Sequence, residues 1–206
     1  KCAAIIQAWY PGEEGGNALA DILYGKVSPS GKLSVSYPNT EVYGPLYLYS
    51  AETDPRVAWE FGYGKSYTTF AYDNLTVDQD ASTASDSIKV TFDVKNTGSV
   101  KGDEIAQVYI SPEESNKNIR PIKLQGFARV SLEPGETKKV QVTLYPDQFG
   151  YYTHDGKRQW NIDPGKYTVK IGASSQDIRL QENITLTGDK VTKPIRDQYF
   201  SEAHVI

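Results

Sequence analysis

The sequence predicts a mainly β protein, in which an antiparallel β-sandwich follows a partial α/β segment and an aromatic-rich connector. From about residue 70 onward, apolar and polar residues alternate with the two-residue period of half-buried strands. Turn signals rich in Gly, Pro, Asn and Asp separate these stretches. The first 25 residues differ, because an apolar run without alternation precedes a stretch with helical spacing.

Composition excludes several classes of protein. The chain has 206 residues, a net charge of −4, one Cys and no Met. A single Cys rules out an internal disulfide and a cysteine-based zinc site, and no apolar run approaches the roughly 20 residues of a membrane span. The mild acidity argues against nucleic acid as a partner. We expect no cofactor, no metal and no membrane contact, and the missing Met predicts a processed or truncated chain or one piece of a larger polypeptide.

Residues 1–38 are predicted to form the terminal strand and helix of an incomplete α/β sandwich domain. The expected strand covers residues 3–8, and the expected helix covers 17–24 with Gly25 as its C-cap. A parallel strand needs neighbours on both sides, and no second unit of this kind follows in the sequence. We therefore expect its neighbours to come from outside the chain, and the whole interpretation depends on residues 1–8 lying in such a sheet.

Residues 39–69 are predicted to be an ordered connector, because their many aromatic side chains need surfaces to lie on. A short alternating stretch at 32–37 is expected to add a strand at a sheet edge. Residues 188–206 are predicted to be a polar, aperiodic tail that lies over a surface.

The β-sandwich is predicted to cover residues 70–187, with Trp160 filling its core. Seven or eight strands are expected, at 71–77, 88–94, 106–110, 123–130, 140–144, 148–152, 167–171 and 178–186.

Several motifs occur in one order along the chain. They are Ala8-Trp9-Tyr10-Pro11-Gly12-Glu13-Glu14-Gly15-Gly16, Pro29-Ser30-Gly31-Lys32-Leu33, Phe61-Gly62-Tyr63-Gly64, Val94-Lys95-Asn96-Thr97-Gly98, Gly102-Asp103-Glu104-Ile105-Ala106-Gln107-Val108-Tyr109, Leu124-Gln125-Gly126-Phe127 and Pro164-Gly165-Lys166-Tyr167. Together they closely resemble the C-terminal third of a glycoside hydrolase family 3 enzyme of the β-glucosidase type. Lys65 departs from the family, which more often has Leu at that position.

The resemblance implies a (β/α)8 barrel, then an α/β sandwich domain, then a fibronectin type III-like domain, with this chain entering near the end of the second. It implies retaining hydrolysis of terminal non-reducing β-D-glucosyl residues, with a β-glucoside or oligosaccharide as substrate. The missing barrel and α/β domain are the expected partners, a homodimer is left open, and the location is expected to be secreted or periplasmic. Which sugar is removed (glucose, xylose or arabinose) stays open.

No catalytic residue is expected in this chain. In the family, the nucleophilic Asp and the acid/base Glu lie on segments that precede it. Glu13 and Glu14 are neighbours in sequence and point in different directions, so they cannot form the facing carboxyl pair of a glycosidase. We expect them to serve as helix-start and interdomain hydrogen-bonding residues.

The other reactive side chains favour structural roles. His154 is expected in a solvated turn, and Cys2 is expected to be a small buried apolar residue. Ser66, Ser174 and Ser175 lack the context of a nucleophile elbow, and His204 has no metal-ligand spacing to another residue.

The aromatic connector is the best candidate for contact with substrate. Weak substrate-binding candidates are Tyr43, Tyr47, Tyr49, Trp59 and Tyr63, whose rings could stack on sugars. Packing between domains is the favoured alternative for the same apolar area.

Two alternatives remain open at this point. Asn74 and Asn183 lie in glycosylation acceptor motifs, which occur as readily by chance. The second function considered is a carbohydrate-binding or adhesive β-sandwich module without catalysis.

Overall fold

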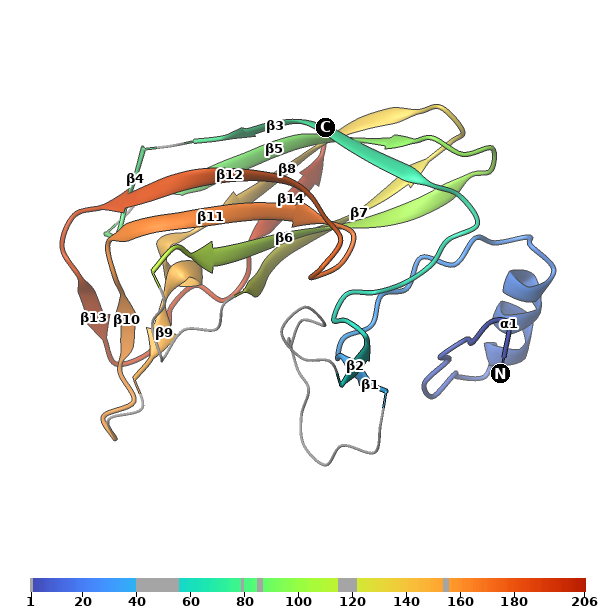
Figure 1. Cartoon of the computed structure of the whole chain (residues 1–206), viewed down its shortest axis with the longest axis horizontal. Helices are drawn as coiled ribbons and strands as arrows, with labels where there is room; N and C mark the ends of the chain where they lie inside the picture. Colours follow the sequence, from blue (N-terminus) through green and yellow to red (C-terminus); the bar gives the residue numbers. More distant parts are fainter. Residues whose placement is uncertain (1, 40–55, 79, 85–86, 115–121, 154–155) are drawn as a thin grey trace.

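The computed structural model describes residues 2–39, 56–78, 80–84, 87–114, 122–153 and 156–206, and it confirms the mainly β fold. Two sheets face each other (Figure 1), with strand orders β4-β12-β11-β6-β7 and β14-β8-β5-β3. Their bounds are β3 (Phe70–Val77), β4 (Asp80–Ser82), β5 (Ile88–Asn96), β6 (Gly102–Pro112), β7 (Lys123–Leu132), β8 (Thr137–Leu144), β11 (Gly165–Gly172), β12 (Ile178–Thr187) and β14 (Glu202–Val205). All neighbours pair antiparallel except β4 and β12, which run parallel.

The core lies between the two sheets and is built by the alternation seen in the sequence. On β5, Phe92 pairs with Val140 of β8, and Val90 pairs with Val142; all four side chains are buried. Each such side chain contributes roughly 1.5–3 kcal/mol when it is fully buried. Trp160 is also buried in this core, as predicted.

The N-terminal segment agrees with the prediction for its helix but not for its strand. Helix α1 (Gly15–Leu23) is present, and Gly25 follows it with φ of 72°. Residues 2–8, however, are exposed and form no strand, so the predicted strand at 3–8 is wrong for this structure. The physical reason is that no strand in the described part of the chain lies beside this segment. Cys2 is likewise exposed rather than buried.

Two further strand predictions need correction. The expected edge strand at 32–37 is reduced to β1 (Tyr37–Pro38), which pairs antiparallel with β2 (Val57–Trp59). The expected strand at 148–152 is replaced by a 3-10 helix, η1 (Pro146–Phe149), followed by the short β9 (Tyr151–Tyr152). Pro146 suits a helix start, and the Gln148 side chain accepts a hydrogen bond from the Tyr145 backbone N–H at 2.8 Å, which closes the turn.

The tail is more ordered than its polar sequence indicates. It forms β13 (Val191–Lys193), which joins β10 (Trp160–Ile162) and β9 in a three-stranded sheet, and then β14, which pairs with β8. In the described residues, no helix is long and apolar enough to cross a membrane.

One buried carboxylate fixes this tail. Asp147, on η1, accepts hydrogen bonds from the backbone N–H of Asp197 at 3.0 Å and of Gln198 at 2.8 Å. Its carboxylate also forms an ion pair with Lys193 at 2.6 Å. Burial alone would raise the pKa of Asp147, but these hydrogen bonds to the charged form outweigh it and hold the pKa below its ordinary value.

Candidate functional site: the connector junction

The connector docks on the outer face of the five-stranded sheet, at a contact that we call the connector junction. It comprises residues 60–62 of the connector and, on the sheet side, Gln107, Tyr109 and residues 173–175. The Gln107 amide donates to the carbonyl oxygens of Gly62 at 3.1 Å and of Ala173 at 2.6 Å. The Tyr109 hydroxyl donates to the Gln107 amide oxygen at 2.5 Å. These hydrogen bonds of the buried Gln107 and Tyr109 side chains fix one geometry of the contact.

Gly62 is required at the centre of the junction. Its φ of 82° lies in the left-handed region, and a Cβ there would lie 2.2 Å from the Gln107 amide oxygen and 2.8 Å from the Tyr109 hydroxyl. Any side chain would therefore have to displace the Gln107 and Tyr109 side chains from their hydrogen bonds or move the connector off the sheet.

Neighbouring bonds hold the connector on both sides of this point. The Ser175 backbone N–H donates to the Phe61 carbonyl at 3.0 Å, and the Ser174 hydroxyl donates to the Glu60 carboxylate at 2.5 Å. Toward the N-terminus, the Gly62 N–H donates to the Leu33 carbonyl at 2.7 Å. The segment around residue 33 is thereby tied through the connector to the sandwich.

A nearly buried ion pair adds to this attachment. Lys32 lies 3.0 Å from Glu104 of β6, and the two side chains are 13% and 6% exposed. Tyr72 of β3 lies beside them. Burial raises the pKa of the Tyr72 phenol well above its ordinary value, and the Glu104 carboxylate raises it further.

We expect Lys32→Met alone to destabilise the chain by about 3 kcal/mol, because it leaves the Glu104 carboxylate buried without its cation. The double variant Lys32→Met/Glu104→Leu should recover most of that loss, since burying an ion pair yields little net stability. Urea unfolding of the two single variants and the double variant gives the coupling energy. If the loss of stability in the double variant equals the sum of the two single losses, the Lys32 and Glu104 side chains do not interact.

Two further contacts join the N-terminal segment to the start of the sandwich. The Tyr67 hydroxyl donates to the Ile22 carbonyl at the end of α1 at 2.8 Å, and the hydroxyls of Ser28 and Ser66 lie 2.8 Å apart. Ser66 therefore has a structural contact in place of a reactive one.

Only some of the predicted substrate-binding aromatic residues lie among the described residues. Tyr43, Tyr47 and Tyr49 lie outside the described residues. Trp59 packs edge-on against Tyr37, with ring centroids 6.2 Å apart. The Tyr63 ring lies 5.5 Å from the Lys65 ammonium. Stacking of any of these rings on a sugar stays a prediction.

The remaining candidates lie apart from one another. Glu14 stands at the N-cap of α1, and its carboxylate accepts a hydrogen bond from the Asn17 side chain at 2.6 Å. His204 lies on β14 opposite Gln141; His154 is outside the described residues. Within the described ranges, no three His, Cys, Asp or Glu side chains gather where they could hold a metal ion.

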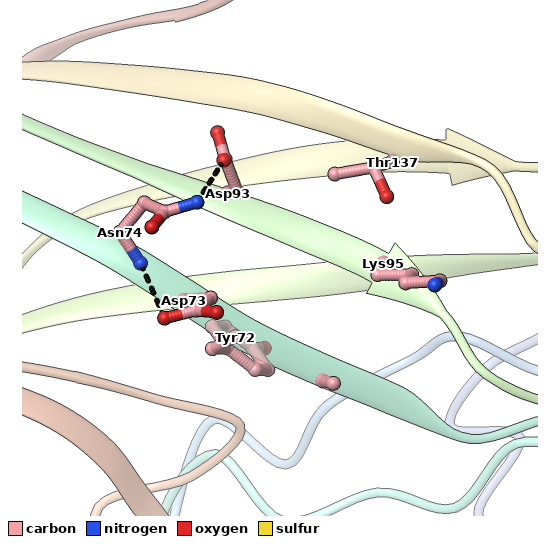
Figure 2. A pocket seen from close by; sticks show the side chains of 7 residues that line it. Tyr72, Asp73, Asn74, Asp93, Lys95 and Thr137 are labelled. Atoms are coloured by element: carbon pink, nitrogen blue, oxygen red, sulfur yellow. Dashed lines mark hydrogen bonds between the residues drawn. The ribbon is translucent and has the colours of Figure 1, made fainter.

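A shallow hollow lies on the outer face of β3 and β5 (Figure 2), and two carboxylates flank it. Asp73 and Asp93 are opposite each other in the β3–β5 register. Asn74, at a bulge with φ of 54°, donates its backbone N–H to Asp73 at 2.8 Å and its side-chain amide to Asp93 at 2.7 Å. Both carboxylates therefore stabilise the bulge, and Asp73 and Asn74 lie exposed on this face of the sheet.

Sequence reasoning missed the central residues of the junction. Gln107 and Tyr109 alternate with the core residues of β6, a pattern that predicts solvent exposure, yet they are 2% and 0% exposed. The sequence does contain one signal for this burial. An amide and an aromatic side chain, Gln107 and Tyr109, lie two residues apart on the outer face of one strand, which could have indicated that another segment covers that face.

In a comparison with known protein families, two family models match the segments on the two sides of the connector junction. The model of the glycosyl hydrolase family 3 C-terminal domain matches residues 1–67, and that of the fibronectin type III-like domain matches residues 104–175. A β-glucosidase of Kluyveromyces marxianus is 44% identical over an alignment of 199 residues, and the match covers 85% of this chain and 23% of that protein. A β-xylosidase of Formosa agariphila is 34% identical over 185 residues, covering 84% of this chain and 25% of that protein.

Solved structures of β-glucosidases also match this chain. The crystal structure of the Kluyveromyces marxianus β-glucosidase in complex with glucose matches with a TM-score of 0.79 and 36% identity, over 90% of this chain and 24% of that one. The chain thus spans about a quarter of the length of the relatives that it matches. The prediction that the family assignment depends on a strand at residues 1–8 is wrong, because these matches hold although residues 2–8 form no strand. The chain belongs to glycoside hydrolase family 3, and it represents the C-terminal region of a β-glucosidase-type member, with part of the family's C-terminal domain followed by the fibronectin type III-like domain.

Proposed function

We propose that this chain is the structural C-terminal part of a retaining β-glucosidase that removes terminal non-reducing β-D-glucosyl residues from oligosaccharides or glucosides. Its role is to complete the α/β domain and to brace that domain through the sandwich. The similarity to β-glucosidases supports the substrate class, and the similarity to a β-xylosidase makes a xyloside the first alternative.

The connector junction is the observation that carries the bracing role. It joins the family 3 C-terminal segment to the sandwich through buried hydrogen bonds and an ion pair. On the other side of the junction, helix α1 has no buried residue, and the nearby Trp9, Tyr10 and Leu23 are all exposed. Residues 5–24 thus expose several large apolar side chains, as a surface that another domain covers does.

The chemistry belongs to the rest of the enzyme in this proposal. Retaining hydrolysis needs a nucleophilic carboxylate and an acid/base carboxyl about 5–5.5 Å apart across the glycosidic bond. The described carboxylates offer no such pair around a substrate-sized cavity. The nucleophile and the acid/base would therefore come from the N-terminal part, as the family resemblance implies.

The test compares this chain with the full-length gene product that contains it. We expect turnover of an aryl β-D-glucoside by the full-length protein, with retained anomeric configuration by NMR, and no turnover by the chain alone. Turnover by the isolated chain would overturn the assignment of the carboxylates, and preference for an aryl β-D-xyloside would change the substrate. A secreted or periplasmic location is part of the proposal, and cell fractionation checks it.

A further inference from the structure

The aromatic side chain of Phe127 lies on the surface of the sandwich and is largely exposed. It lies on β7, and its side chain is 59% exposed. Among the described residues of the five-stranded sheet, it is the only large hydrophobic side chain that is exposed. A lone exposed Phe is common on protein surfaces, so its position relative to other contacts decides its meaning.

That position is directly beside the connector junction. In the β6–β7 register, Phe127 pairs with Gln107, the residue that holds the connector. Directly paired residues of neighbouring strands project from the same face of the sheet, so both side chains lie on the outer face. One of the pair is wholly covered by the connector, and the other is mostly bare. The cover over this face therefore ends between two directly paired residues, Gln107 and Phe127.

We infer that Phe127 is an anchor for the N-terminal part of the same enzyme, which extends the connector junction across β7 and covers this ring with an apolar surface. The inference rests on the proposed function and names the residue through which the sandwich contacts the missing domains. Continuity supports this occupant over others, because the connector that meets Gln107 leads back to the exposed apolar segment around α1.

The rest of the face limits the size of the anchor. Two residues further along β7, Arg129 forms an ion pair with Asp103 of β6, and its side chain is 66% exposed. Polar residues of this kind typically surround the apolar centre of an interface. Arg129 therefore marks the expected rim, and it serves as a matched control on the same strand and face.

The experiment measures Phe127→Ala in two contexts. In the full-length gene product, we expect Phe127→Ala to raise the rate of thermal inactivation about tenfold. The rate is measured at a temperature at which the unchanged enzyme has a half-life of about one hour. This rate depends on the barrier to unfolding, which contacts between domains raise. In the isolated chain, the urea midpoint should stay unchanged, since the ring is already exposed there. Arg129→Ala should leave the inactivation rate within twofold and the midpoint unchanged.

Three results would overturn the inference. One is an unchanged inactivation rate in the full-length protein. Another is an equal loss of stability in the isolated chain, which would make Phe127 a local packing residue. The third is a change in the oligomeric state of the isolated chain, which would show that a second copy covers the ring. A full-length protein without glycosidase activity would instead contradict the proposed function; calorimetric unfolding then replaces the inactivation rate in the Phe127 test.

Discussion

Gly62→Ala is expected to lower the free energy of unfolding of this chain by about 3 kcal/mol. The left-handed backbone costs a residue with a Cβ roughly 1 kcal/mol. Displacement of the connector would also break the bonds of the Gln107 amide, and leaving such a buried group unsatisfied costs roughly 1–3 kcal/mol. Urea unfolding followed by tryptophan fluorescence measures the sum, because Trp59 on the connector and Trp160 in the sandwich core report both parts.

Gly135→Ala separates the two causes. Gly135 has nearly the same backbone conformation, with φ of 79°, but a Cβ there meets nothing within 4 Å. We expect it to cost only the backbone contribution of about 1 kcal/mol. Equal losses for the two variants would mean that the junction contributes nothing beyond local strain at Gly62. Limited proteolysis of Gly62→Ala should also show faster cleavage after Lys65, as the connector detaches.

Asp147→Ala is expected to destabilise the chain by about 2–3 kcal/mol and to release the tail from the sandwich. The carboxylate is buried while it holds Lys193 and two backbone N–H groups, and removing one partner of such a network is costly. Hydrogen exchange should report the release as faster exchange in β13 and β14, with β5 and β8 less affected.

Asp197→Ala is the matched control for this prediction. Asp197 binds the same lysine at 2.7 Å, but its side chain is 76% exposed. Exposed ion pairs contribute about 0–1 kcal/mol, so we expect little change in stability and no release of the tail. Comparable effects of the two substitutions would show that the Lys193 charge, and not the buried carboxylate, organises the tail.

The Asp147 contribution should also depend on pH. Because its pKa is lower in the folded chain than in the unfolded chain, its stabilisation is complete above the unfolded value of about 3.9. It is lost as the pH falls through the folded value. The difference in stability between the unchanged chain and Asp147→Ala should therefore be constant from pH 7 to about pH 5 and shrink below about pH 4. A difference that stays constant at acidic pH would contradict the assignment.

Most of the sandwich was predictable from the sequence because strands such as β5 and β8 are buried mainly on one face. Ile88 to Val94 and Val140 to Leu144 alternate without interruption, so the pattern alone fixes which side chains face the core. The same logic fails for residues 3–8, whose apolar run predicts a strand only if neighbours are present. The tail strand β14 was missed because all its residues are exposed, and its pairing with β8 leaves no alternation.

The connector junction could be predicted only in part. The glycines of the 61–64 motif indicate a tight backbone, but the sequence does not say which surface the backbone approaches. That surface depends on Gln107 and on residues 173–175, which lie far away along the chain and come together through the register of β6 and β11. Contacts of this kind are tertiary, and local patterns carry no record of them.

The parallel pairing of β4 with β12 has a consequence for how the protein forms. The Thr187 hydroxyl donates to the Ala81 carbonyl across a sequence separation of 106 residues. The sandwich therefore cannot close until the whole of β12 has left the ribosome. Synthesis of the residues between β4 and the end of β12 takes roughly 5–20 s at 5–20 residues per second. Strand pairings between such distant segments also slow folding to about milliseconds or seconds. During that interval the apolar inner faces are unprotected, and exposed apolar surface of this kind makes a folding chain prone to aggregation.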